Sequence, residues 1–377
     1  MLKTILLINP VYVTLFWAIV LNTYSFRKHN PKNFLGKFMI VAFVVYLSHF
    51  FYFSGLFEYY RFVDSLYIWA FLLVYPLYHI YIRLLTVEKR FSFKKHGRFL
   101  ALPTFIFVVY LIGVLVITKD EHLYYLIEIL PGTGSHSGMQ SFLFLVFNLA
   151  RVVFILQVFY YLFMNFRLII QNSKSLEDYY SDTEGRELVW VQVFNISLAV
   201  TSVASILVAV IGRDAFAESA YLLIAPSLIF STMLFLIGLI GNKQNPAYIE
   251  DLEHENEGES NINFNYTSLK KRLDVLFEKD EIYKTPDLKI WDIAEKLGSN
   301  RTYVSKLINV EYKRNFCNHV NYYRVKHAKQ LIKDNPGLSN QLVADLSGFG
   351  SVKSLHRAFN TIGETPLNNL RKEIQSK

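Results

Sequence analysis

Cysteine is almost missing from this chain of 377 residues, because Cys317 is the single one. One thiol excludes an internal disulfide and a thiolate metal cluster. The sequence also lacks a metal-ligand spacing, a phosphate-cradling glycine loop and a pair of catalytic carboxylates. We therefore expect a protein that is not an enzyme, with no catalytic residue, no metal and no cofactor.

Charged residues are scarce, at 19% of the chain, whereas hydrophobic residues make up 52%, with 32 Phe and 25 Tyr. A soluble globule cannot easily cover so much apolar surface. The net charge of +8 is also unevenly placed. Residues 1–266 carry 19 basic and 19 acidic side chains, and residues 267–377 carry 20 basic and 12 acidic ones. A neutral apolar part followed by a basic part suggests a membrane domain joined to a domain that binds a polyanion.

Seven apolar runs are each near the ~20 residues that a helix needs to cross about 30 Å of hydrocarbon. They are residues 4–26, 38–57, 66–82, 99–118, 139–166, 188–212 and 219–242. We predict a polytopic domain of seven spanning helices over residues 1–242. The first run is interpreted as a retained helix and not as a signal peptide, because it is long and lacks a small-x-small cleavage site.

The loops between these runs predict the orientation of the domain, because Lys and Arg concentrate in short cytoplasmic loops. With the N-terminus outside, the inner loops hold 12 of these residues and the outer segments hold 4. Seven crossings then place the basic C-terminal part in the cytoplasm. Residues 243–266 are predicted to be an acidic linker, either a tether that can occlude the basic domain or only a solvated spacer.

The basic part predicts two helix-turn-helix units. In the first, Ile293, Ala294 and Leu297 form the buried stripe of a short helix, which Gly298 ends. Ser299 or Asn300 is expected to cap a second helix, whose Val304, Leu307 and Ile308 face inward. The same pattern returns with Val343, Ala344 and Gly348, followed by a helix that buries Leu355, Ala358 and Phe359. A long helix between the units is expected to end at Asn335, Pro336 and Gly337.

These residues resemble the AraC/XylS family of bacterial transcription regulators over roughly residues 267–373, and we expect the DNA-binding domain to comprise residues 267–377. The resemblance rests on the Ile293-Ala294 to Gly298 turn, Tyr322-Tyr323-Arg324 to Ala328 with Leu331-Ile332, the Ala344 to Gly348-Phe349 turn, Phe359, and Gly363-Glu364-Thr365-Pro366. It implies an all-helical DNA-binding domain, and with the membrane part an all-α chain in the bacterial inner membrane. Gly350 stands where a cap is expected and Ser351 follows, so the pattern leaves the start of the second reading helix open.

By this resemblance, two sets of side chains contact double-stranded DNA, with Lys and Arg mainly positioning the domain on phosphates and the polar residues reading bases. They are Arg301, Thr302, Tyr303, Ser305 and Lys306 in the first unit, and Ser351, Lys353, Ser354, His356 and Arg357 in the second. The resemblance does not extend to the apolar part, so it implies no input signal.

Polar side chains at membrane depth are candidates for sensing, because they are costly there. We selected Arg151, Asn148, His49 and His79. Arg151 either forms part of a pocket for an unknown anionic ligand or pairs with another helix, for example through Glu128.

We therefore expect a membrane-anchored, sequence-specific DNA-binding transcription regulator that transmits a stimulus from the membrane domain. Its expected partners are DNA, membrane lipid, an unknown stimulus ligand and, because tethering raises the effective concentration at adjacent half-sites, a second copy. The alternatives are a membrane transporter or membrane enzyme with a basic regulatory tail, and a tether that binds DNA without sequence preference.

Overall fold

The computed structural model describes residues 2–23, 31–88, 90–184, 191–192, 195–196, 199, 202, 220–243, 266–362 and 365–375. Apart from one isolated β-bridge, the regular structure over these residues is helical. The chain divides into two compact units. Unit 1 comprises Met1–Ile170 and Leu188–Tyr248, and unit 2 comprises Gln171–Glu187 and Ile249–Lys377.

Among the residues that the structure describes, six helices of unit 1 are long and apolar enough to cross a membrane. They are α1 (Leu2–Thr23), α2 (Pro31–Phe53), α3 (Phe57–Thr86), α4 (Phe93–Val116), α6 (Gly138–Tyr179) and α9 (Ala220–Lys243). Each contains most of one predicted apolar run. The remaining predicted span, residues 188–212, lies largely outside the described residues. The structure therefore supports several membrane-spanning helices, and the count of seven stays a prediction.

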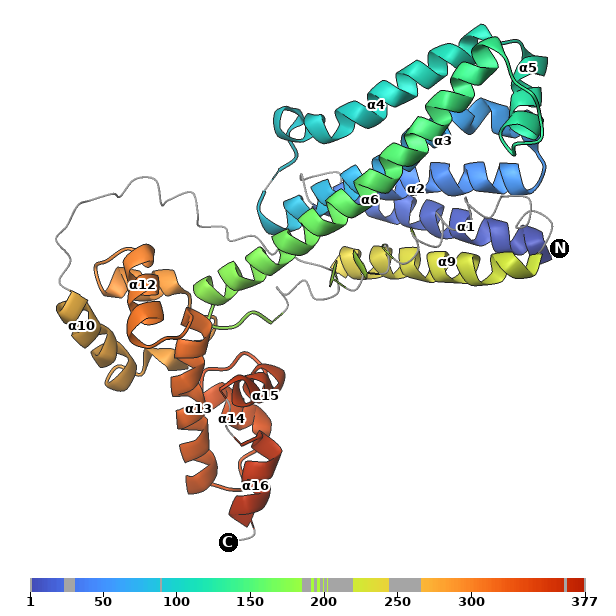
Figure 1. Ribbon diagram of the computed structural model, residues 1–377. Coiled ribbons are helices and arrows are strands. Elements are labelled where there is room, and N and C mark those ends of the chain that lie inside the picture. Colours follow the sequence, from blue (N-terminus) through green and yellow to red (C-terminus); the bar gives the residue numbers. More distant parts are fainter. Residues whose placement is uncertain are drawn as a thin grey trace. The chain divides into compact units, whose positions relative to one another are not determined.

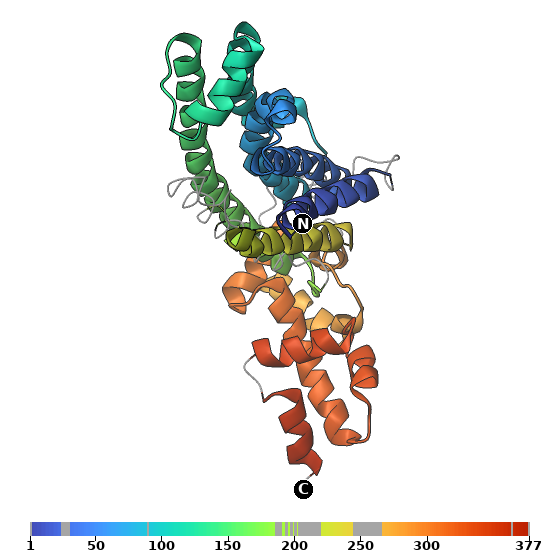
Figure 2. The same cartoon turned by 90° about the vertical axis from the view of Figure 1, so that its right-hand side faces the viewer.

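The core of unit 1 is built around α3, whose apolar window is the most buried of the six. Its side chains, including Tyr67 and Leu72, pack with Ile106 of α4, Phe147 of α6 and Leu126 of the π-helix η1 (Tyr125–Ile129). In both views of the chain, α1 and α2 run beside each other and beside α9 (Figure 1, Figure 2). The short helix α5 (Lys119–Tyr124) precedes η1 and starts with a capping box between Thr118 and Glu121.

Prolines lie inside four of these helices without ending them, at Pro10, Pro76, Pro103 and Pro226. A proline removes one backbone donor and frees the carbonyl four residues earlier. In α1 the carbonyl freed by Pro10 is that of Leu6, and it accepts a hydrogen bond from the hydroxyl of Ser227 on α9. Side-chain bonds of this kind help helices to tolerate proline in a membrane.

Unit 2 is organised around α13 (Phe316–Asp334), which lies between two groups of shorter helices (Figure 1, Figure 2). The first group is α10 (Tyr266–Glu278), the 3₁₀ turn η3 (Ile282–Lys284), α11 (Ile290–Lys296) and α12 (Arg301–Glu311). The second group is α14 (Asn340–Leu346), α15 (Val352–Thr361) and α16 (Leu367–Gln375). The N-terminal half of α13 buries Phe316 and Val320, and its C-terminal half packs Ala328 and Ile332 on α14 and α15.

The last turns of α6, from Gln171 onward, belong to unit 2, although the sequence analysis counts these residues within the membrane domain. The predicted fifth run ends at residue 166, whereas α6 continues to Tyr179. From Gln171 onward the added turns are mostly polar, and Glu177 accepts a hydrogen bond from Asn315 of the same unit. The predicted boundaries at residues 242 and 267 stay predictions.

Candidate nucleic-acid interface

The first helix pair of unit 2 is α11 followed by α12. Gly298 has a φ of 57° and turns the chain after α11. Asn300 then caps α12, since its side chain accepts a bond from the backbone N–H of Tyr303 at 2.9 Å. Of the two caps that the sequence allowed, Asn300 is the one used. Val304, Leu307 and Ile308 face the core, as the periodicity predicts.

The second pair is α14 followed by α15. Gly348 has a φ of 79° at the turn, and a Cβ there would lie 2.6 Å from the carbonyl oxygen of Tyr283. Ser351 caps α15 by accepting a bond from the backbone N–H of Ser354 at 3.0 Å. The helix therefore begins at Val352, one residue later than a cap at Gly350 would allow. This result sets the register that the sequence pattern left open.

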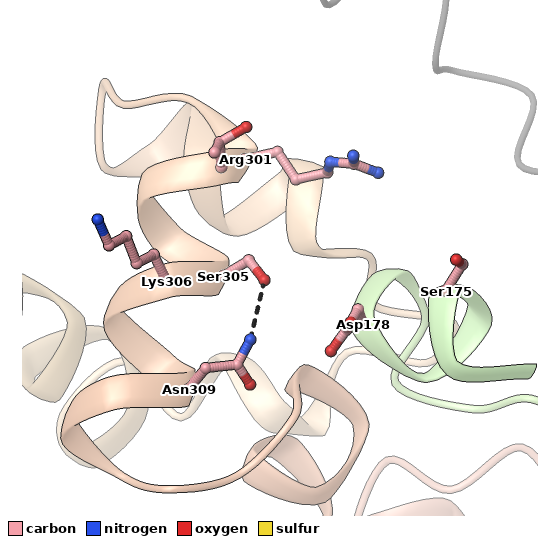
Figure 3. Close-up of a pocket in the computed structure, with 7 residues that line it drawn as sticks. Ser175, Asp178, Arg301, Ser305, Lys306 and Asn309 are labelled. Carbon is pink, nitrogen blue, oxygen red and sulfur yellow. Dashed lines mark hydrogen bonds between the residues drawn. The ribbon is translucent and has the colours of Figure 1, made fainter. Parts of the chain in front are cut away.

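Four of the five residues proposed on α12 lie on one side of the helix. Thr302 and Lys306 are exposed, and Arg301 and Ser305 are half-buried. Tyr303 is also half-buried. Figure 3 shows Arg301 and Ser305 facing Asp178 and Ser175 at the end of α6, with Ser305 accepting a bond from Asn309 at 3.4 Å. An acidic side chain thus lies opposite a cation that the resemblance assigns to DNA.

The proposed residues of α15 differ from the prediction at one position. Lys353 is exposed, and Ser351, His356 and Arg357 are half-buried. The DNA contact that the resemblance implies for Ser354 requires an exposed side chain, and this expectation is wrong, because Ser354 is only 5% exposed. Its hydroxyl completes the capping box by donating to the carbonyl of Ser351 at 2.9 Å and accepting from the N–H of that residue at 3.2 Å. Ser354 therefore positions the start of α15.

Residues 177–184, at the end of α6 and just after it, contact both helix pairs. Ser181 donates its backbone N–H to the carbonyl of Leu288 at 2.9 Å, and Tyr180 forms an isolated β-bridge with Lys289. Sequence reasoning missed this contact and counted the stretch as part of a basic inner loop. The only sequence signal is the cluster of carboxylates, namely Glu177, Asp178, Asp182 and Glu184.

Arg324 is the largest fully buried side chain of the described residues, and it joins α13 to the turn η3. Its Nε donates to the carbonyl of Tyr283 at 2.7 Å, and its Nη2 donates to the carbonyl of Thr285 at 2.8 Å. Burial lowers the pKa of this guanidinium to about 10, which leaves it charged at neutral pH. The resemblance included Arg324 in its motif but implied no partner for it.

The residues proposed for sensing lie at separate contacts in unit 1. His49 lies 3.3 Å from the hydroxyl of Tyr67, and His79 lies 2.6 Å from Oδ1 of Asn165. Arg151 donates to Oδ1 of Asn148 on the same helix at 3.3 Å. Glu128, the partner suggested for Arg151, accepts a bond from the hydroxyl of Thr133 at 3.1 Å. Both interpretations of Arg151, the ligand pocket and the pair with another helix, stay predictions.

The sequence analysis missed a buried polar cluster around Asp64, which is 2% exposed. Its Oδ2 lies 3.0 Å from Nε2 of His122 and accepts a bond from the hydroxyl of Tyr110 at 3.0 Å. The cluster therefore connects α3, α4 and α5. Asp64 stands two residues before the apolar run 66–82, and for that reason it was counted outside the membrane.

Residues 293–373 match the model of a protein family described as a helix-turn-helix domain. The matched range starts in α11 and ends in α16, so it contains both helix pairs and α13. Within it, Gly363 and Glu364 lie outside the described residues. No curated protein and no solved structure matches the chain. The family match supports an AraC-type helix-turn-helix domain and a DNA-binding transcription regulator, with several helices that are apolar enough for a membrane anchor.

Proposed function

We propose that this chain is a membrane-anchored transcription regulator that binds specific DNA sequences through α12 and α15. The observation that supports this proposal is the helix-turn-helix match. The matched residues fold as two helix pairs packed on α13, and the second helix of each pair begins with a capping residue. The 19 residues of α13 span about 28 Å at about 1.5 Å per residue. This length is close to the ~34 Å between successive major grooves on one face of DNA.

We assign the positioning contacts to four basic residues, Arg301, Lys306, Lys353 and Arg357, because phosphate contacts orient such a domain on the duplex. Thr302, Tyr303, Ser305 and His356 are the candidates for reading base edges. Ser351 stays in the set but is reassigned from base reading to a phosphate contact, because it caps α15 and a helix N-terminus attracts anions. Ser354 leaves the set of base-reading residues, because its hydroxyl is used within the capping box.

The same proposal places the N-terminus outside, the helix-turn-helix domain in the cytoplasm and seven helices in the membrane. Reporter fusions at Lys95 and at His122 test this orientation. An intracellular signal from Lys95 and an extracellular one from His122 are expected, and the reverse pattern contradicts the orientation. The chain is proposed to be a regulator and not an enzyme.

The membrane helices are proposed to sense a stimulus that favours one of their packings over another, because coupling requires a difference in affinity between two states. Arg151, with Asn148 beside it, is the first candidate for contact with that stimulus. Arg151→Ala is expected to abolish the response in cells while the protein level stays normal. Loss of the folded protein would instead assign Arg151 to packing.

The decisive experiment selects bound fragments from random DNA at about 150 mM salt, because specificity separates a regulator from a tether. We would run it with the full chain in lipid nanodiscs and, in parallel, with residues 262–377. An enriched site with two short blocks about one helical turn apart is expected. Arg301→Ala should reduce its enrichment, whereas Lys326→Ala, an exposed change on α13, should not. Selection without any enriched sequence would contradict the proposal.

A further inference from the structure

Residues 177–184, here called the acidic segment, lie where the proposed function requires DNA. Four of these eight residues carry carboxylates, Glu177, Asp178, Asp182 and Glu184. The segment belongs to the same compact unit as the helix-turn-helix domain, so its contacts lie within one unit. It touches residues at the N-terminal ends of three helices, α12, α13 and α15.

The acidic segment is held by specific contacts and not only by charge. Tyr179, Tyr180 and Ser181 are buried. The backbone N–H of Ser181 is bonded to Leu288, and its hydroxyl accepts a bond from Nη2 of Arg324 at 3.3 Å. The side chain of Asn315, which caps α13, donates to Glu177 at 2.9 Å. The segment therefore has a defined docking position.

At α15 the acidic segment contacts the same side chains that we assign to DNA phosphates. Glu184 accepts a hydrogen bond from the hydroxyl of Ser351, the cap of that helix. Its other carboxylate oxygen lies 3.6 Å from Nζ of Lys353. The hydroxyl of Thr183 accepts a bond from Nη1 of Arg357 at 3.3 Å. A carboxylate at a helix N-terminus beside a lysine resembles a bound phosphate.

At α12 the acidic segment lies against the first residue of the other proposed reading helix. The guanidinium of Arg301 lies 5.6 Å from the ring centre of Tyr179. Asp178 and Arg301 line the same pocket, with Asp178 facing α12 (Figure 3). Three of the four basic residues assigned to phosphates, Arg301, Lys353 and Arg357, are therefore engaged by this segment. A DNA backbone that binds these groups must therefore compete with the segment for them.

We propose that the acidic segment is a built-in competitor for DNA, which occupies the N-terminal ends of α12 and α15 and must leave before the domain can bind a duplex. This inference rests on the proposed function, because it assigns the same residues to DNA. The first residues of the segment are also the last turns of α6, whose apolar part is a candidate membrane span. Movement of that one helix is then a direct route from the membrane to the DNA-binding surface.

The test compares DNA affinity for full-length variants in lipid nanodiscs, with a mixed-sequence duplex as the probe. The double variant Asp182→Asn with Glu184→Gln removes two charges from the segment and keeps the shapes of the side chains. Its matched control is Glu278→Gln with Asp334→Asn, an equal change of charge at exposed positions of α10 and α13. Glu184→Gln alone serves if the double variant does not fold.

The double variant is expected to bind DNA roughly tenfold more tightly than the control variant, because occlusion lowers the apparent affinity by the fraction of open molecules. Equal affinity of the two variants, or weaker binding by the double variant, would overturn the inference and indicate that the acidic segment only stabilises unit 2. DNA binding by none of the proteins would refute the proposed function itself, so the two failures are distinguishable.

Hydrogen exchange of the wild-type chain gives a second measurement that needs no substitution. The N–H of Ser181, bonded to Leu288, should exchange faster when saturating DNA is present, because the segment has been displaced. Continued protection of this amide in the DNA complex would show that the segment stays docked, which contradicts competition.

Discussion

At the scale of single residues, two buried ionisable side chains of unit 2 differ in their charge at neutral pH. Arg324 keeps its charge, because two backbone carbonyls accept its donors. His319 packs against the rings of Phe277, Tyr312 and Tyr323, and its Nδ1 has no hydrogen-bond partner within the part of the chain that the structure describes. Burial then lowers the pKa of His319 to about 4, so that it is neutral at pH 7.

Arg324→Met is expected to lower the free energy of unfolding of unit 2 by roughly 2–5 kcal/mol, because the buried carbonyls of Tyr283 and Thr285 lose their donors. Urea unfolding followed by the fluorescence of Trp291 on α11 measures this change. Lys326→Met serves as the control, because it removes an exposed cation from the same helix. Equal stability of the two variants would contradict the structural role of Arg324.

His319 predicts a dependence of stability on pH. The unfolded chain binds a proton at this histidine below about pH 6.5, whereas the folded protein does so only near pH 4. The free energy of unfolding should therefore fall as the pH decreases from 6.5 to 4, by at most about 1.4 kcal/mol per pH unit from this residue, and level off below. His319→Phe should flatten this part of the curve in urea unfolding.

An unchanged slope in His319→Phe would assign the dependence to other groups. His327 is one of these, because burial and nearby Lys284 lower its pKa too, and it remains in the variant. A residual dependence is therefore expected in His319→Phe, but it should be smaller than in the wild type.

At the scale of elements, the two helix pairs are alike in pattern but not in packing. Both turns contain a glycine with a positive φ, 57° at Gly298 and 79° at Gly348. Nothing lies within 4 Å of a Cβ added at Gly298, whereas one at Gly348 would meet the backbone of Tyr283 and Lys284. The second turn therefore packs on η3 as well as reversing the chain.

Gly348→Ala should destabilise unit 2 more than Gly298→Ala. At Gly298 only the left-handed conformation is penalised, by about 1–2 kcal/mol. At Gly348 a backbone clash is added, so a loss at least about twice as large is expected. Urea midpoints of the two variants measure the difference. Equal midpoints would mean that the backbone near Tyr283 moves away from the added Cβ at no cost in stability.

At the scale of the whole molecule, the separation of charge is the main feature. The excess of basic residues lies in residues 267–377, beside a front part that is neutral overall and rich in apolar residues. The acidic segment is part of that neutral front stretch in the sequence, yet it docks within unit 2. Net charge by region therefore describes solubility and partners, but it does not show which charges meet.

DNA affinity should depend steeply on salt. Four phosphate contacts give a slope of about −3.6 for the logarithm of affinity against the logarithm of salt, or roughly a hundredfold loss between 50 and 200 mM. Lys306→Ala should reduce this slope by about 0.9, and fluorescence anisotropy with a labelled duplex measures it. Lys326→Ala is the control, and an equal reduction there would mean that Lys306 makes no special contact.

The sequence by itself determined the local structure. Apolar runs, turn glycines and capping residues predicted the long helices of unit 1, the start of α12, the end of α13, and the helix-turn-helix character of residues 293–373. These features depend on periodicity and on backbone preferences within a few residues, and for this reason a sequence pattern contains them.

Only the tertiary structure decided which distant residues meet. Ser351 and Glu184 are 167 positions apart, Asp64 and His122 are 58 apart, and Arg324 reaches a carbonyl 41 positions away. No periodicity relates such positions, because their contact results from the packing of separate helices. Packing also buried Ser354 and placed the acidic segment on α12 and α15, and that contact turns a DNA-binding domain into one with its own competitor.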